Sequence, residues 1–242
     1  MEHLPSVGCN HLLDAMGPEA RALLEPHFED VPFGQGQVLH EPRDDIDAVY
    51  FPHSGLVSIV AALEKSDKII ETATIGREGA VGAMAGFGPR RAFRRAVVLV
   101  AGGARRIPAP RLREAVDRSA RLRDILARYS GVLLAQAQQS VACNAFHEAE
   151  ERLARWLLQT RDRIDSDTIP LTQESLAQML GVRRTTVTLI AHALQERGLL
   201  RYRRGRIEIA DRDGLAAIAC ECYEAGRRQF DEYFPHAPRS MP

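Results

Sequence analysis

The stretch LTQESLAQMLGVRRTTVTLIAHALQERGLLRYRRGRIEI, residues 171–209, decides how the whole chain is interpreted. Its apolar residues recur at helical spacing on both sides of Gly181, which stands where a helix usually ends. Thr172 is suited to cap the first helix, because its hydroxyl can accept a backbone N–H of the first turn. We predict a second helix from Arg183, followed after Gly198 by an arginine-rich β-hairpin. That order predicts a winged helix-turn-helix, whose second helix lies in the major groove of DNA.

Two arginines stand at the start of the second predicted helix, where the helix dipole disfavours cations. Arg183 and Arg184 each cost roughly 0.3–1 kcal/mol there, and Arg183 cannot accept the hydrogen bond that a capping position offers. Phosphates and guanine edges bind the flat fork of arginine donors, which gives the chain a reason to keep them. The alternative is a solvated basic surface. We predict that the DNA-binding residues are Thr172, Gln173, Arg183, Arg184, Thr185, Thr186, Thr188, Leu189, Arg201 and Arg203.

Charge is distributed unevenly along the chain. Residues 171–210 contain seven arginines and three glutamates, a local net charge of +4. The first 50 residues contain two arginines and ten acidic residues, a local net charge of −8. The overall net charge of +0 therefore combines an acidic front with a basic module. The arginines of the predicted hairpin would bind phosphates and add affinity rather than base specificity; they are Arg201, Arg203, Arg204 and Arg206.

The 171–209 stretch resembles the DNA-binding motif of the Crp/Fnr transcription regulators. The shared skeleton is Thr172, Leu176, Ala177, Gly181, Arg184, Thr186, Val187, Leu194, Gly198 and Leu199. The resemblance implies a homodimer on double-stranded DNA with a two-fold symmetric site, and RNA polymerase as a further partner. Many family members have a glutamate and a further arginine where this chain has Thr185 and Leu189. We therefore expect an operator that differs from the usual family palindrome.

Length and composition fit a cytoplasmic globular protein with two cores. The chain has 242 residues, of which 45% are hydrophobic and 26% charged. It contains no run of 18 apolar residues that could span a membrane, and its first 15 residues lack the features of a secretory signal. Four scattered cysteines do not form a disulfide framework, which favours a reducing compartment.

Residues from about 28 to 108 are rich in short apolar runs separated by turn residues. This spacing suggests a barrel or a double-stranded β-roll. The family resemblance points to the same jelly-roll sensor domain. We therefore predict an α+β fold with an N-terminal β-roll over residues 20–110.

Residues 109–144 change to a helical pattern, with apolar residues spaced alternately by four and three. We predict a dimerisation helix and hinge over residues 111–147, with an interface formed by Leu122, Leu126, Tyr129 and Leu133. The alternative is a helix packed only on its own β-roll. Residues 148–242 would then form the winged helix-turn-helix domain, opened by an amphipathic helix that buries Leu153, Trp156 and Leu157.

The sensor region lacks part of a cyclic-nucleotide site. In the family's cyclic-AMP binders a Gly-Glu pair holds the ribose and an Arg-Ser pair holds the phosphate, and the matching pairs here are Gly82–Ala83 and Arg95–Ala96. Alanine cannot accept a hydrogen bond from ribose, and losing such a partner costs about 1–3 kcal/mol. We predict that cyclic AMP is not a tight effector. Gly82, Ala83, Arg94 and Arg95 stay candidates for binding another anion, against the alternative of a solvated loop.

The sequence indicates no metal site and no cofactor. Cys143 and His147 share a helix face, but two ligands rarely make a site. Cys220 and Cys222 are expected on different sides of a helix, as core or surface residues. The remaining pair is Cys9 and His11, near the terminus.

Two further functions compete with a DNA-binding regulator. A cupin-like enzyme would need a His/Glu ligand set on the strands, and His40, Glu41 and His53 do not have the usual spacing. We therefore predict that the chain is not an enzyme. The second alternative is an effector-binding signalling or scaffold protein with little DNA binding.

Overall fold

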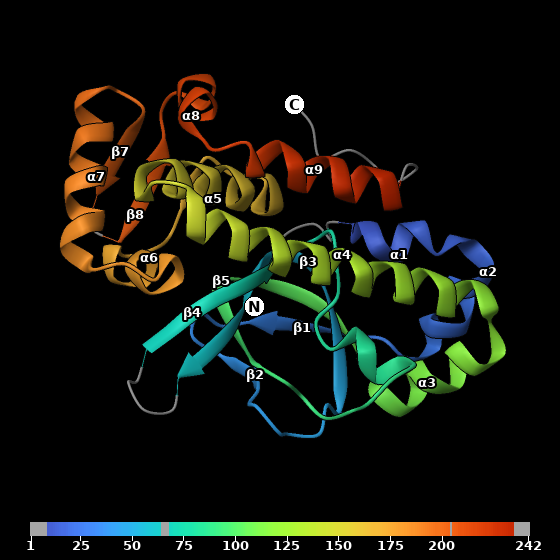
Figure 1. Ribbon diagram of the computed structural model, residues 1–242. Helices are drawn as coiled ribbons and strands as arrows, with labels where there is room; N and C mark the ends of the chain where they lie inside the picture. Colours follow the sequence, from blue (N-terminus) through green and yellow to red (C-terminus); the bar gives the residue numbers. More distant parts are fainter. Residues whose placement is uncertain (1–8, 64–67, 204, 235–242) are drawn as a thin grey trace, which may run out of the picture.

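A curved antiparallel sheet forms the N-terminal half of the protein (Figure 1). The computed structural model describes residues 9–63, 68–203 and 205–234. Two short helices, α1 (His11–Ala15) and α2 (Gly17–Leu24), and a 3-10 turn, η1 (Glu25–His27), precede the sheet. Its strands are β1 (Glu29–Phe33), β2 (Val38–His40), β3 (Ala48–Leu63), β4 (Lys68–Ile75) and β5 (Arg95–Pro108). They run in the order β1-β5-β3-β4, and β2 pairs with β5.

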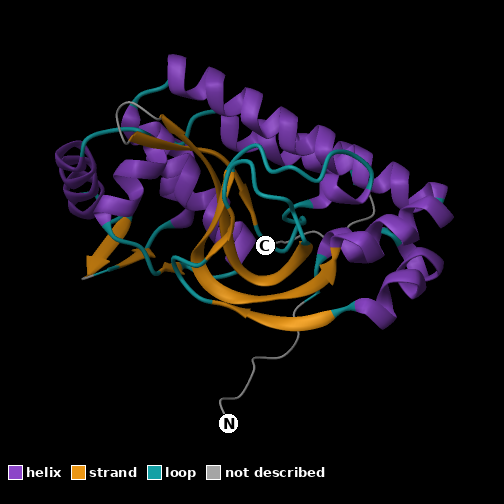
Figure 2. Ribbon diagram, turned by 90° about the horizontal axis from the view of Figure 1, so that it is seen from below, coloured by secondary structure: helices purple, strands orange, loops and turns teal. Residues whose placement is uncertain are grey.

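The sheet curls because its two long strands, β3 and β5, are interrupted by register shifts (Figure 2). The shifts lie between Pro52 and Val57. Here Gly55 has a φ of 78°, and a Cβ atom on Gly102 would lie 2.5 Å from the backbone of the opposite strand. Glycines therefore allow the close backbone approach that turns the sheet into a roll.

Two helices follow the sheet, where one long helix was expected. α3 (Ala109–Arg118) ends at Ser119, whose extended backbone breaks the helix and whose side chain accepts the Leu122 N–H at the start of α4. α4 (Ala120–Phe146) then runs the length of the molecule and lies along its edge in Figure 2. A short 3-10 turn, η2 (Ala83–Gly86), packs against both helices.

The C-terminal region contains the predicted helix-turn-helix and wing. Its elements are α5 (Ala149–Ile164), β6 (Thr168–Ile169), α6 (Gln173–Leu180), α7 (Arg184–Glu196), β7 (Leu200–Arg203), β8 (Arg206–Ile209), α8 (Arg212–Ile218) and α9 (Cys222–Tyr233). The three short strands form a sheet in the order β6-β8-β7. Thr172 caps α6 by accepting the Ser175 N–H, and Gly181 ends it with a φ of 65°. The predicted α+β fold class is confirmed, and no described helix could cross a membrane.

The residues predicted as a dimer interface face inward. Leu122, Leu126 and Tyr129 are 0–1% exposed and pack with α1, α2 and α3 in one hydrophobic core. Leu133 is half-buried against the same core. The chain's own core covers the side chains of Leu122, Leu126 and Tyr129, which contradicts the predicted contact of these three residues with a partner helix. For the half-buried Leu133, that contact stays a prediction. The alternative, packing on the β-roll, describes this face of α4.

A second hydrophobic core joins the two halves of the chain. It combines Leu56 and Val100 of the N-terminal sheet with Trp156 of α5 and Met179 of α6, all of them buried. The amphipathic helix was predicted to bury Leu153, Trp156 and Leu157, and these are 0–3% exposed. The helix-turn-helix is therefore held against the N-terminal sheet within one chain.

Candidate nucleic-acid interface

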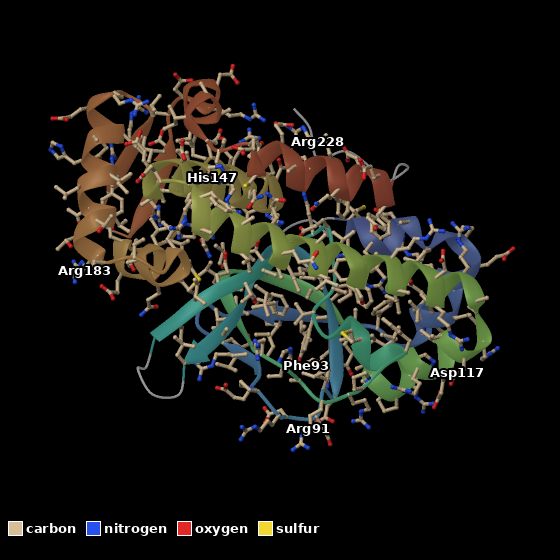
Figure 3. All side chains as sticks on the ribbon, viewed as in Figure 1. Arg91, Phe93, Asp117, His147, Arg183 and Arg228 are labelled. Carbon is tan, nitrogen blue, oxygen red and sulfur yellow. The ribbon has the colours of Figure 1, made fainter. Side chains whose placement is uncertain are left out.

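The recognition helix α7 presents its first turn to the outside (Figure 3). Arg183 occupies the N-cap position with an extended backbone, φ −74° and ψ 145°, and its side chain makes no capping hydrogen bond. Val187 and Leu194 are fully buried on the opposite side of the helix. The buried side fixes the orientation of α7, so Arg183 and its neighbours point away from the core.

Most of the predicted DNA-binding residues lie on this outer face. Arg183, Arg184, Thr185 and Thr188 are exposed, and Leu189 is 73% exposed although it is apolar. Thr186 is half-buried. Arg183 has no ion-pair partner among the described residues, and Arg184 has only a long contact of 3.9 Å with Glu174. Both guanidinium groups therefore keep donors for a ligand.

Two predicted contact residues on the α6 side already have internal partners. The Thr172 hydroxyl accepts the Ser175 N–H at 3.1 Å, which is a capping role. The Thr188 hydroxyl donates to Gln173 Oε1 at 2.8 Å and so links α6 to α7. Contact of Thr172 and Gln173 with DNA stays a prediction, and their internal bonds position the recognition helix.

The wing is a tight hairpin with cations on its exposed side. Arg201 forms an ion pair with Glu208 at 3.0 Å, whereas Arg203 lies directly opposite Arg206. Like charges opposite each other destabilise a β pair, and phosphate groups would relieve that repulsion. Arg204, also expected in the wing, lies outside the described residues.

The four candidate effector residues differ in their surroundings. Gly82 has a φ of 81° at the start of η2, and Ala83 is buried behind it. Arg95 is held by Glu41 through bonds of 2.9 and 2.7 Å, while Arg94 donates to the Phe93 carbonyl. The structure therefore ties these arginines to the protein's own acceptors.

A cavity of about 390 Å³ opens beside this region, but its lining is acidic. It is lined by Leu39, His40, Asp44, Asp45, Ile46, Asp47, Ala48, Tyr50 and Arg106. Asp44, Asp45 and Asp47 outnumber the single cation Arg106 in this lining, which disfavours an anionic ligand there. That cyclic AMP is not a tight effector stays a prediction.

Polar contacts connect the N-terminal sheet to α5 at β4 and in the loop that follows β4. Glu71 accepts hydrogen bonds from the Ser58 hydroxyl and from the Trp156 indole N–H, each at 2.6 Å. Burial raises the pKa of Glu71 to about 6, because desolvation outweighs these hydrogen bonds. Nearby, Glu78 pairs with Arg163 of α5 at 2.9 Å. Part-buried polar contacts therefore join the N-terminal sheet and the loop after β4 to α5.

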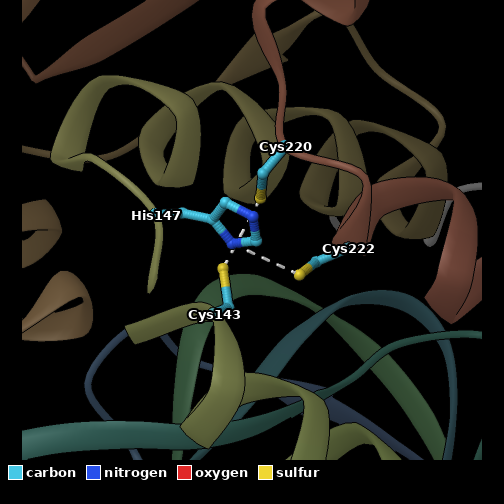
Figure 4. Close-up of side chains that lie close together, drawn as sticks. All are labelled: Cys143, His147, Cys220 and Cys222. Atoms are coloured by element: carbon cyan, nitrogen blue, oxygen red, sulfur yellow. Dashed lines mark hydrogen bonds between the residues drawn. The ribbon is translucent and has the colours of Figure 1, made fainter. Parts of the chain in front are cut away.

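The structure corrects the sequence analysis on the cysteines (Figure 4). Cys220 lies in the turn before α9 and Cys222 is the first residue of α9, so both side chains face Cys143 and His147 at the end of α4. The prediction that Cys220 and Cys222 point in opposite directions assumed one continuous helix. In the structure α8 ends at Ile218 and α9 begins at Cys222. Among the described residues this is the one group of three or more possible ligands close enough for a single ion, and His40, Glu41 and His53 form none.

Comparisons with known proteins agree with this geometry. The family model of the Crp-like helix-turn-helix domain matches residues 151–218. The structure of FixK2 from Bradyrhizobium japonicum is 17% identical, covers 80% of this chain and 98% of its own, and superposes with a TM-score of 0.68. TTHA1359, a CRP/FNR-family transcriptional regulator from Thermus thermophilus, is 25% identical over 79% and 98%, with a TM-score of 0.64. CLP, a c-di-GMP responsive global regulator from Xanthomonas campestris, is 18% identical over 80% and 99%, also at 0.64. No curated protein sequence matches.

Proposed function

We propose that this chain, a Crp/Fnr-type transcription regulator by its helix-turn-helix domain and its fold, binds a two-fold symmetric DNA site as a homodimer. The observation that carries the proposal is the exposed first turn of α7. Its arginines stand at the helix end that disfavours cations, and they retain donors for phosphates or guanine edges. The wing arginines would add phosphate contacts that position the protein without selecting a sequence.

The outward face of α4 supplies a surface for a second copy. Five residues on this face are spaced alternately by four and three, which is the heptad pattern of a helix pair. They are Ala127, Gly131, Leu134, Gln138 and Val141. Leu134 and Val141 are 60% and 71% exposed, and a Cβ atom on Gly131 would meet nothing within 4 Å. The small residues Ala127 and Gly131 allow close helix approach. We therefore place the dimer seam here rather than on the buried face.

A parallel pair of α4 helices suits a symmetric DNA site. Each α4 carries its own DNA-binding region at its C-terminal end, so the pairing puts two copies of α7 at the same end of the dimer. Two-fold proteins of this kind bind half-sites about one helical turn of DNA apart. The N-terminal sheet, as the sensor, would bias the placement of the two α7 helices through Glu71 of β4 and through Glu78 in the loop that follows β4. RNA polymerase is the proposed further partner.

The test combines sedimentation with DNA binding. Leu134→Glu and Val141→Glu would each place a carboxylate in the seam, and we expect monomers that lose high-affinity binding to a selected symmetric site. Phe93→Glu is the matched control, because Phe93 is 66% exposed on the β-roll and lies off α4. This control should sediment as the wild type and bind the same site.

Two outcomes would refute parts of the proposal. A wild-type monomer at micromolar concentration would remove the homodimer. A dimer that binds every duplex with equal affinity would instead fit the signalling or scaffold protein with little specific DNA binding.

A further inference from the structure

Four side chains from three segments converge at the hinge between α4 and α5. The sulfur atoms of Cys143, Cys220 and Cys222 and a ring nitrogen of His147 all lie within 4.8 Å of one another. The three cysteines are 0–5% exposed, and the His147 side chain is 16% exposed. Figure 4 shows the three sulfurs grouped around the imidazole ring of His147.

The spacing of these atoms is close to that of a tetrahedral ligand set, with two of the separations at 3.5 and 3.6 Å and all of them within 4.8 Å. A tetrahedral zinc ion with Zn–S bonds of about 2.3 Å places its sulfur ligands roughly 3.8 Å apart, and a nitrogen ligand slightly closer. Cys143 Sγ lies 3.5 Å from Cys220 Sγ, and Cys222 Sγ lies 3.6 Å from His147 Nδ1. We infer that Cys143, His147, Cys220 and Cys222 bind a single Zn²⁺ ion as a closed, structural Cys₃His site.

Other sulfur chemistry fits these distances less well. A disulfide requires sulfurs about 2.05 Å apart, and the four cysteines are free. An iron–sulfur cluster distributes its ligands over several iron atoms and therefore needs them farther apart than one ion does. Soft thiolate and imidazole ligands in a tetrahedral arrangement favour zinc over hard cations such as Mg²⁺.

Two neighbouring side chains support the ligand roles. His147 Nε2 lies 2.9 Å from Glu221 Oε2, so the carboxylate accepts its proton and leaves the Nδ1 lone pair directed at the sulfurs. Gln139 Nε2 donates to Cys222 Sγ at 3.0 Å, which stabilises a thiolate. Such second contacts orient metal ligands in known sites, and their loss typically lowers metal affinity about 10–100-fold.

The ion would hold the hinge in one arrangement. Cys143 lies in the last turn of α4, and His147 caps that helix. Cys220 lies in the turn between α8 and α9, and Cys222 is the first residue of α9. One ion would thereby fasten the DNA-binding region to the proposed dimerisation helix. This regulatory consequence rests on the proposed function, whereas binding of the ion does not.

The first test measures zinc in the full chain without DNA. Protein purified under reducing conditions and dialysed against micromolar Zn²⁺ should retain one equivalent, which shields the three ligand cysteines from alkylation. Cys143→Ser and Cys222→Ser should lose the ion. Cys9→Ser is the control, because Cys9 is exposed and outside the group, and it should retain the ion. The proposed zinc site would be overturned if the wild-type protein retained no zinc. It would also be overturned if a Cys143–Cys220 disulfide were found in protein purified under reducing conditions.

The second test avoids substitutions in the core. Glu221 is 78% exposed, so Glu221→Ala should fold normally. We expect it to lower Zn²⁺ affinity about 10–100-fold, whereas Glu224→Ala, on the exposed face two residues into α9, should leave affinity unchanged. Co²⁺ should give the visible bands of a tetrahedral thiolate site in wild type and lose them in Cys222→Ser. Octahedral Co²⁺ spectra in wild type would contradict the ligand set.

The third test separates the site from its consequence. We expect removal of Zn²⁺ by a chelator to weaken specific DNA binding at least tenfold, with restoration when Zn²⁺ is returned. Zinc binding without any effect on DNA affinity would overturn the hinge role and leave the site standing. Zinc binding by a protein that binds no DNA would refute the proposed function instead.

Discussion

Arg183 breaks a local rule of helix formation at an exposed position. It stands at the N-cap of α7, where Ser, Thr, Asp or Asn would satisfy a free N–H, and it makes no such bond. Thr172, at the corresponding position of α6, follows the rule and caps its helix. The two neighbouring helices thus differ in the type of their N-cap residue. The residue that breaks the capping rule, Arg183, lies on the face proposed to meet DNA. Local rules are most often broken where a ligand compensates for the cost.

Arginines in α7 and in the wing should have separable effects on DNA binding. Arg184→Ala should reduce discrimination at one base pair by about 1–3 kcal/mol. Arg203→Ala should weaken specific and random DNA alike and reduce the slope of affinity against salt concentration, because it removes a phosphate contact. Titrations at several salt concentrations measure both. Arg228→Ala, exposed on α9 away from α7, is the charge-matched control. Equal losses for both variants on all sequences would contradict the assignment.

Glu71 should make stability depend on pH in a defined window. Its pKa is raised from 4.5 to about 6 by burial, so the folded protein holds this proton more tightly than the unfolded chain. Below about pH 4.5, ionisation of the Glu71 carboxyl therefore does not lower the free energy of unfolding. As the pH rises from about 4.5 to about 6, the free energy of unfolding falls, and above about pH 6 this loss is constant. One pKa unit corresponds to about 1.4 kcal/mol. The total loss in the free energy of unfolding is therefore on the order of 2 kcal/mol.

The matched variant is Glu71→Gln, which keeps the shape and cannot ionise. Urea unfolding of both proteins between pH 4 and 8 gives the difference in unfolding free energy. We expect the variant to gain stability relative to the wild type as the pH rises through the window. A difference that is independent of pH would show that Glu71 does not carry a buried charge.

At the scale of elements, α4 has two faces with heptad spacing, and only packing chooses between them. The line with larger residues, Leu122, Leu126 and Tyr129, is buried in the chain's own core. The line with smaller residues, from Ala127 to Val141, is left outside. Burying the larger apolar area releases more free energy, at roughly 25 cal/mol per Å². The chain's own core therefore covers the face with the larger residues, and the face with the smaller residues is the one proposed to meet a second copy.

The turn between α6 and α7 should be sensitive to a single methyl group. Gly181 has a φ of 65°, and a Cβ atom there would lie 3.1 Å from Ile70 Cδ1 of β4. Gly198 ends α7 with a φ of 75° and has nothing within 4 Å of that position. Both alanine variants should lose about 1–2 kcal/mol through the left-handed backbone, and Gly181→Ala should lose more because it also crowds Ile70. Urea unfolding measures both.

Ile70→Val tests the cause, because it removes the Cδ1 atom that the new methyl group would meet. In the Ile70→Val background, Gly181→Ala and Gly198→Ala should cost the same. An excess cost that persists there would mean that the contact with β4 does not explain it. A double-mutant cycle isolates this term.

At the scale of the whole molecule, one hydrophobic core is shared by the N-terminal sheet and the helix-turn-helix, and it restricts how the two can move relative to each other. Leu56 and Val100 pack in the same cluster as Trp156 and Met179, and Ser58 Oγ lies 3.4 Å from Met179 Sδ. Shared apolar burial of this kind couples regions that a sequence description separates into domains. If α7 moves relative to the N-terminal sheet, the side chains of this shared core must therefore repack or shift against one another.

Trp156 reports on that coupling, because it is the chain's single tryptophan and is 3% exposed. We expect denaturant unfolding followed by its fluorescence to coincide with unfolding followed by far-ultraviolet circular dichroism. Trp156→Phe, which should abolish the fluorescence transition, confirms the origin of the signal. A fluorescence change that precedes the loss of helix would show that the two regions separate before they unfold.

The sequence by itself determined the helix-turn-helix, its wing and the basic character of the recognition helix. Those features depend on caps, glycine positions and helical periodicity within about 40 residues, and such interactions are local. Only the tertiary structure decided which face of α4 is buried and which ligands gather at the hinge. Cys143 and Cys220 are 77 residues apart, and their meeting depends on a break after α8 and on the packing of α9 against α4. Residue spacing cannot specify such long-range contacts, because they arise from how whole elements cover one another's apolar surfaces.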